Sequence, residues 1–322
     1  MKMNTNPEWL LRMAEKEANR IISVGGFVNR VEMNVGVQSM PAMTRSEWTK
    51  IFPVSVMRKL RFSLPEGVSD VEALLQFFGV ASPDAWRSKW GDYAVAFRQT
   101  QKFDFHREAL TAWVREAEII AGQIPLADFD EEKLRGSLDE FRRLTREDTQ
   151  VGLDRAQLLC AKAGVALVLV PELPGTRISG CARWLNDRHA MIGLTVRYKW
   201  ADQLWFTFYH EVAHVLLHRR RLFVIDNAAD HMGDAVVDPV MAKYEEEADR
   251  FAGDLLIPPV ALAEFLSRHG ETLTSEEIHA FADSIEIGPG MVVGRLQHDE
   301  ILKHWQGNML RQKLGWDFVT ED

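Results

Sequence analysis

The chain has 322 residues, 46% of them apolar and 26% charged, a composition typical of a globular protein with one large or two medium domains. A net charge of −9 argues against broad electrostatic attraction to nucleic acid or to an anionic membrane. The two cysteines are too few for a disulfide framework or a thiolate metal cluster, and no apolar run is long enough to cross a bilayer.

Helical periodicity dominates the first half of the chain. An irregular segment rich in Gly, Val and Met, residues 23–44, interrupts it. We expect residues 1–150 to form a helical region that regulates access to a site or selects a substrate, because they contain no evident chemistry of their own. Apolar residues at spacings of three and four predict helices over residues 7–22, 45–62, 69–78, 106–122 and 130–146.

The pattern changes near residue 150. After a predicted helix over 151–163, three short β-like runs follow, at 165–170, 178–185 and 190–196. Their short connections favour an antiparallel sheet, since parallel strands need longer crossovers. We therefore expect an α+β fold, in which a helical N-terminal region precedes a domain over 151–322 with a small antiparallel sheet. Helical patterns return at about 202–220, 239–257, 259–268, 274–285 and 289–303.

The segment WFTFYHEVAHVLLH, residues 205–218, combines an apolar helix with four ionisable groups. On a helical wheel His210, Glu211, His214 and His218 share a polar stripe about 100° wide, and apolar residues occupy the other sides. Two histidines one turn apart can bind the same zinc ion, and the glutamate between them can act as a general base. Asp202 is suited to the N-cap of this helix.

A third metal ligand is expected on the helix over 239–257, which contains the sequence EEEADRF. The wheel places Glu245 on the inward side and directs Glu246 and Glu247 away from it. Asp249 lies one turn after Glu245 and is expected to accept the second N–H of a ligand histidine. The predicted zinc ligands are thus His210, His214 and Glu245.

Other interpretations of these residues remain open. The polar stripe can also be a hydrogen-bonded core cluster that holds no metal. His218 either caps the helix or lines the pocket of the site. His231 is expected to be a solvated loop residue, and Cys181 to be a packing residue of a strand.

The sequence FTFYHEVAHVLLH followed by EEEADRFAGDLLIPP resembles the ImmA/IrrE-type zinc metallopeptidases, whose helix pair carries HExxH and ExxAD motifs. The resemblance implies zinc on His210, His214 and Glu245, with Glu211 as the base and Asp249 as a supporting carboxylate. It also implies a minor-gluzincin-like fold for the domain over 151–322.

The C-terminal sequence IGPGMVVGRLQHD and the earlier LLQFFGVASPDAW are similar to the longer family members that are fused to a HigA-like antitoxin repressor. In those proteins a helix-turn-helix module comes first. Residues 1–45 offer one good helix and an irregular segment, so we expect this module to be absent or replaced. Direct binding to nucleic acid is therefore not expected, and neither is membrane association.

The expected activity is that of a zinc-dependent endopeptidase in which Glu211 deprotonates the attacking water. The N-terminal stretch has no apolar run suited to a signal peptide, which favours a cytoplasmic location. The resemblance points to a repressor or antitoxin as the cleaved partner, in a stress, phage or toxin–antitoxin response. The alternative is a non-catalytic antitoxin or transcriptional regulator whose metal site is structural or inactive.

Overall fold

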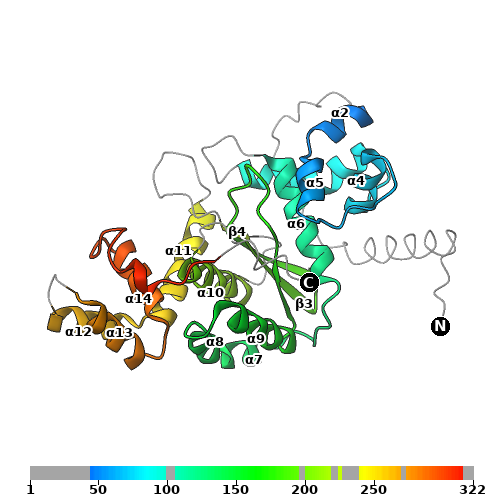
Figure 1. Cartoon of the computed structure of the whole chain (residues 1–322). Helices are drawn as coiled ribbons and strands as arrows, with labels where there is room; N and C mark the ends of the chain where they lie inside the picture. The colour runs from blue at the N-terminus through cyan, green and yellow to red at the C-terminus, as the bar shows by residue number, and fades with distance from the viewer. Residues whose placement is uncertain are drawn as a thin grey trace. The chain divides into compact units, whose positions relative to one another are not determined.

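The computed structural model describes residues 44–98, 106–195, 200–218, 224–226, 239–269 and 273–314, and all of them belong to one compact unit (Figure 1). The helix expected over 7–22 lies outside these residues. The question of a helix-turn-helix module over 1–45 also falls almost wholly outside them.

The first described helices form a layer with an aromatic core. The rings of Trp48, Phe52, Phe78 and Trp86 pack edge to face or at a tilt, with centroids 5.2 to 6.5 Å apart. One helix was expected over 45–62, but two are present, because Pro53 has no backbone N–H and restricts the residue before it. The helices of this layer are α2 (Arg45–Lys50), α3 (Val54–Lys59), α4 (Asp70–Phe78), α5 (Pro83–Arg98) and α6 (Arg107–Ala121).

Three further helices, α7 (Glu131–Gly136), α8 (Leu138–Leu144) and α9 (Thr149–Lys162), precede the sheet. The single helix expected over 130–146 is broken at Ser137, which ends α7 and begins α8. Apolar residues of α7 and α8 lie in the same core as those of α9. The division of the chain at residue 150 stays a prediction, although in packing terms α7 and α8 lie with the second part.

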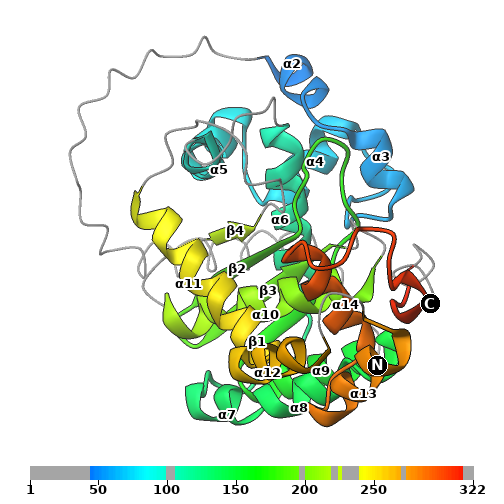
Figure 2. The same cartoon turned by 90° about the vertical axis from the view of Figure 1, so that its left-hand side faces the viewer.

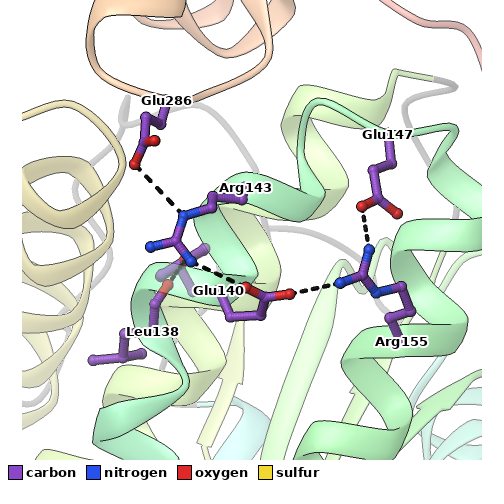
Figure 3. A network of polar contacts seen from close by, with 7 residues as sticks. Leu138, Glu140, Arg143, Glu147, Arg155 and Glu286 are labelled. Carbon is purple, nitrogen blue, oxygen red and sulfur yellow. Dashed lines mark hydrogen bonds and ion pairs between the residues drawn. The ribbon is translucent and has the colours of Figure 1, made fainter.

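Arginine side chains attach α8 to its neighbours (Figure 3). Arg143 pairs with Glu140 and with Glu286, which lies just after a later helix, α13 (Ser275–Ser284). Arg155 of α9 pairs with Glu140 and Glu147. These groups are exposed to solvent, so each pair contributes only about 0–1 kcal/mol. The network links α8 to α9 and to Glu286 but adds little stability, and the buried residues Leu138, Phe141 and Leu144 hold α8 in the core.

Four strands form one sheet in the order β1-β3-β2-β4. The pair β2–β3 is antiparallel, as expected, and so is β2–β4, but β1 pairs with β3 in parallel. The expectation of an antiparallel sheet is therefore wrong for β1. Its connection to β2 is short, yet the two are not neighbours, because β3 turns back through a hairpin and takes the place between them. The strands are β1 (Val165–Leu169), β2 (Gly180–Asn186), β3 (His189–Leu194) and β4 (Val224–Asp226).

The sheet is buried on both faces and separates two cores (Figure 2). Alternate strand residues point to opposite sides. Ala166 and Val168 of β1 face the layer that contains α6, while Val165 and Leu167 face α9 and the helix that follows β3. This burial on both faces explains why β1 is apolar throughout and β3 is apolar after His189.

The remaining helices follow the expected order. Within the part of the chain that the structure describes, no helix combines the length and hydropathy that a bilayer crossing requires. The α+β class is confirmed. These helices are α10 (Ala201–Leu217), α11 (Pro239–Leu256), α12 (Pro259–His269), α13 (Ser275–Ser284) and α14 (Pro289–His298), with a short 3₁₀ turn at Asn308–Leu310.

The expectation that Asp202 caps α10 is wrong. The N-cap is Trp200, and Asp202 is a buried residue of the first turn. Its oxygens Oδ1 and Oδ2 accept hydrogen bonds from Nε and Nη2 of Arg311, at 2.9 and 2.8 Å. The Arg311 guanidinium also lies 4.5 Å from the ring of Trp200. Asp202 thus binds an arginine more than a hundred residues away and does not cap the backbone N–H groups of its own helix.

Replacing Arg311 by Gln should destabilise the protein by about 3–5 kcal/mol, because it leaves the Asp202 carboxylate buried without a countercharge. The free energy of unfolding in urea measures this loss. Arg135→Gln is the control: it breaks the exposed pair with Glu131 and should cost less than about 1 kcal/mol. Equal losses in the two variants would show that the buried pair contributes no more to the free energy of unfolding than the exposed pair does.

Candidate metal centre

Helix α10 is enclosed by the fold on nearly every side. It packs against α11, α14 and the strands β2 and β3, and nearly all of its residues are buried. The Tyr209 hydroxyl donates a hydrogen bond of 2.7 Å to the carbonyl of Leu138, which fixes the rotation of the helix. With its apolar sides in the core, part of the polar stripe is directed at α11.

Two histidines of α10 and one glutamate of α11 converge on a common point. The Nε2 atoms of His210 and His214 are 2.9 Å apart. Glu245 places Oε2 3.0 Å from Nε2 of His210 and Oε1 3.7 Å from Nε2 of His214. One donor atom from each of the three residues lies within 4.8 Å of the other two. Two imidazole nitrogens and a carboxylate oxygen at this spacing form a donor set that fits one transition-metal ion.

The surroundings favour the protonation states that a metal ion needs. Burial lowers the pKa of His214, and the neighbouring imidazoles of His210 and His218 add to this effect, although the Glu245 carboxylate opposes it. Burial works to raise the pKa of Glu245, but the hydrogen bonds to His210 and His214 outweigh it and hold this pKa at about 2. Neutral imidazole and ionised carboxylate are the forms that bind metal ions.

The second nitrogen of His210 is held by Asp249. Its Nδ1 lies 2.8 Å from Oδ1 of Asp249. Since a carboxylate can only accept, Nδ1 carries a proton, which leaves Nε2 as the nitrogen that would bind a metal ion. This is the contact that the sequence predicted for Asp249, although the sequence did not say which histidine it would hold.

Glu211 lies on the same helix, fully buried, where β2 begins. A Cβ atom at Gly180 would lie only 2.7 Å from Oε1 of Glu211 and 2.7 Å from Cγ2 of Thr207. Gly180 therefore lets the backbone of β2 approach the carboxylate closely. The sequence analysis missed this residue, and its only signal was a glycine inside an otherwise β-like run.

The structure brings His210, His214, Glu245 and Asp249 together, and their roles as ligands and support stay predictions, as does that of Glu211. Glu246 is exposed. His231 lies outside the described residues. Cys181 is buried in β2, where burial raises the pKa of its thiol well above the ordinary value, as suits a packing residue.

The expectation that Glu247 points away from α10 is wrong. Its Oε2 lies 3.0 Å from Nε2 of His218, the buried C-cap residue of α10. A helical wheel gives the direction of the Cα–Cβ bond only, and the flexible glutamate side chain reaches past Tyr244, whose ring lies 4.2 Å from that of His218.

Gly180→Ala should destabilise the protein by about 1–3 kcal/mol, since the new methyl group overlaps Glu211 and Thr207 in a closely packed region. Thermal unfolding measures the change. Gly136→Ala in α7 is the control, because nothing lies within 4 Å of the added carbon, and there the substitution should stabilise by up to about 1 kcal/mol. A Gly180→Ala variant as stable as the wild type would contradict the close approach.

In a comparison with known protein families, one segment of the chain matches a family model. Residues 181–297 match the family model of the IrrE N-terminal-like domain, Peptidase_M78. The matched range runs from β2 to α14 and includes every residue of the candidate metal centre. No curated protein sequence matches the chain. The segment from β2 to α14 is therefore an IrrE N-terminal-like domain, of the kind found in the ImmA/IrrE-type peptidases.

Proposed function

We propose that the protein is a zinc-dependent endopeptidase that cleaves a regulatory protein. The observation that carries this proposal is the convergence of His210, His214 and Glu245 on one point, with Glu211 on the same helix. The peptidase family of the domain supports it.

Zinc is the metal that suits this donor set best. Zinc sites in peptidases typically use two histidines and one carboxylate, and three protein ligands leave a fourth position for water or substrate. A bound zinc ion supplies Lewis acidity, which polarises a carbonyl group and makes water a stronger acid. Neither Cys160 nor Cys181 belongs to the cluster, so a thiolate site is not proposed.

Each residue of the site then has its own role in the reaction. His210 and His214 present their Nε2 lone pairs, and Asp249 keeps His210 in the required tautomer. Glu211 accepts a proton from the attacking water and later delivers it to the leaving amine. The backbone of β2 at Gly180 limits where the Glu211 carboxylate can lie.

An extended peptide could reach the site along β4. Among the described strands β4 lies at one edge of the sheet, next to β2, and it also contacts α10. We propose that substrate adds to this edge by backbone hydrogen bonds, so that its scissile bond lies over the histidines.

The proposed substrate is a DNA-binding regulator or antitoxin. The net charge of −9 suits a basic protein better than it suits DNA. The helical layer from α2 to α6 covers the face of the sheet opposite α10 and is proposed to select this partner.

The metal assignment predicts about one zinc ion per chain in the wild type. His214→Ala and Glu245→Ala should each lose most of it, because each removes one of three ligands. Metal analysis after gel filtration measures the content. Glu246→Ala is the matched control, an exposed neighbour on the same helix that should keep its zinc. Equal loss from the two glutamate variants would refute the ligand set.

Glu211→Gln should keep the fold and the zinc content but lower the cleavage rate by about 10²–10⁴-fold, because it preserves size and removes the base. The assay incubates the protein with a co-encoded DNA-binding regulator and maps the fragments by mass spectrometry. Cleavage by the variant at the wild-type rate would exclude Glu211 as the base.

Casein serves as the substrate control in the same assay. The regulator should be cut at one or a few positions, and casein should be cut only poorly. The reason is that a peptidase without substrate selectivity would digest other proteins of the cell. Efficient casein digestion would contradict the proposed selectivity but not the metal chemistry. A wild type that binds zinc and cuts neither protein would favour a regulator with an inactive site.

A further inference from the structure

We infer that His218 and Glu247 form a hydrogen-bonded chain that holds His214 in its metal-binding tautomer and orientation. The inference rests on the proposed metal site. It makes His218 and Glu247 positioning residues, which act on the metal only through His214.

The first step concerns the contact between the two imidazoles. The Nδ1 atoms of His214 and His218 are 2.9 Å apart, a hydrogen-bond distance. His218 is not part of the donor set that converges on one point, so no metal ion would separate the lone pairs of these two Nδ1 atoms, and one of the two atoms carries a proton. If His214 is to offer the lone pair of Nε2 to a metal ion, its own proton is on Nδ1, and Nδ1 of His218 is the acceptor.

The second step follows from the first. A neutral His218 that accepts at Nδ1 carries its proton on Nε2. That nitrogen lies 3.0 Å from Oε2 of Glu247, and a carboxylate can only accept. Every proton is thereby assigned: Nε2–H of His218 donates to Glu247, and Nδ1–H of His214 donates to His218. The pattern is self-consistent without any further group.

The two histidine ligands are thus held in different ways. His210 donates directly to the Asp249 carboxylate, whereas His214 reaches the Glu247 carboxylate through a second imidazole. Metal-binding histidines nearly always donate their other N–H to an acceptor that fixes the ring. His218 lies one helical turn after His214, at the end of α10, where it fills this role.

Burial protects the hydrogen bonds that run from His214 through His218 to Glu247. The side chains of His214 and His218 are 1% and 2% exposed, so water has little access to the contact between them. The ring of Tyr244 lies against His218 on the α11 side. Glu247 is the partly exposed end of the chain, at 29%. Loss of the acceptor would leave a buried N–H of His214 without a partner, and the ring would turn or change tautomer.

The test measures zinc affinity by competition with a chromophoric chelator. His218→Leu should weaken zinc binding by about 10–100-fold, because it removes the acceptor while filling a similar volume. His218→Asn should recover much of the loss, since its amide oxygen lies as far from Cβ as Nδ1 of histidine does and can accept from Nδ1 of His214. Glu247→Ala should weaken binding more than Glu246→Ala, its exposed neighbour on α11.

Cobalt substitution gives a second measurement that packing alone would not change. The visible absorption of Co²⁺ bound to His218→Leu should differ from that of the wild type, since the His214 ring is held differently. Circular dichroism of the metal-free proteins reports whether each variant is folded. If His218→Leu fails to fold, the comparison of Glu247→Ala with Glu246→Ala decides the question.

Two results would overturn the inference while leaving the zinc site in place. One is a folded His218→Leu protein with wild-type affinity and spectrum. The other is a wild type that binds two zinc ions, one of which is lost in both His218→Leu and Glu247→Ala, because those residues would then be ligands of a second site. A wild type that binds no zinc would instead refute the proposed function on which the inference rests.

Discussion

The burial of α10 is the constraint on which the rest of the structure depends. A helix that is apolar on most sides has to be enclosed, and here the sheet, α14 and α11 enclose it. Its polar groups then need partners inside the protein, because unpaired polar groups in a core cost several kcal/mol. The carboxylates of α11 supply them, and the candidate metal centre is the place where the two helices meet.

Segments remote in sequence hold this helix in place. Arg311, close to the end of the described chain, pairs with Asp202 in the first turn of α10, and Tyr209 is bonded to the carbonyl of Leu138 in α8. On the sheet side, Gly180 permits β2 to lie against Glu211. The geometry of the site therefore depends on contacts that span most of the described chain, and each of them restrains the rotation or translation of one helix.

Several predictions from the sequence failed for one shared reason. The helices expected over 45–62 and 130–146 are each broken in two, β1 pairs in parallel, Asp202 does not cap α10, and Glu247 turns toward His218. In each case a proline, a turn or a residue distant in sequence determined the structure, and not the local sequence pattern on which the prediction rested. Periodicity describes which side of an element is apolar. It contains no information on which element covers that side.

The sequence by itself determined the α+β class, the presence of α10 and α11, and the inward position of His210, His214 and Glu245, because helical spacing and residue type are properties of short segments. It could not determine that Asp249 holds His210 while His218 and Glu247 hold His214, nor that Gly180 borders Glu211. Those pairings depend on how far α11 is shifted and rotated along α10 and on the order of the strands. Only the packing of the whole core decides these quantities, since no single segment contains both partners of such a contact.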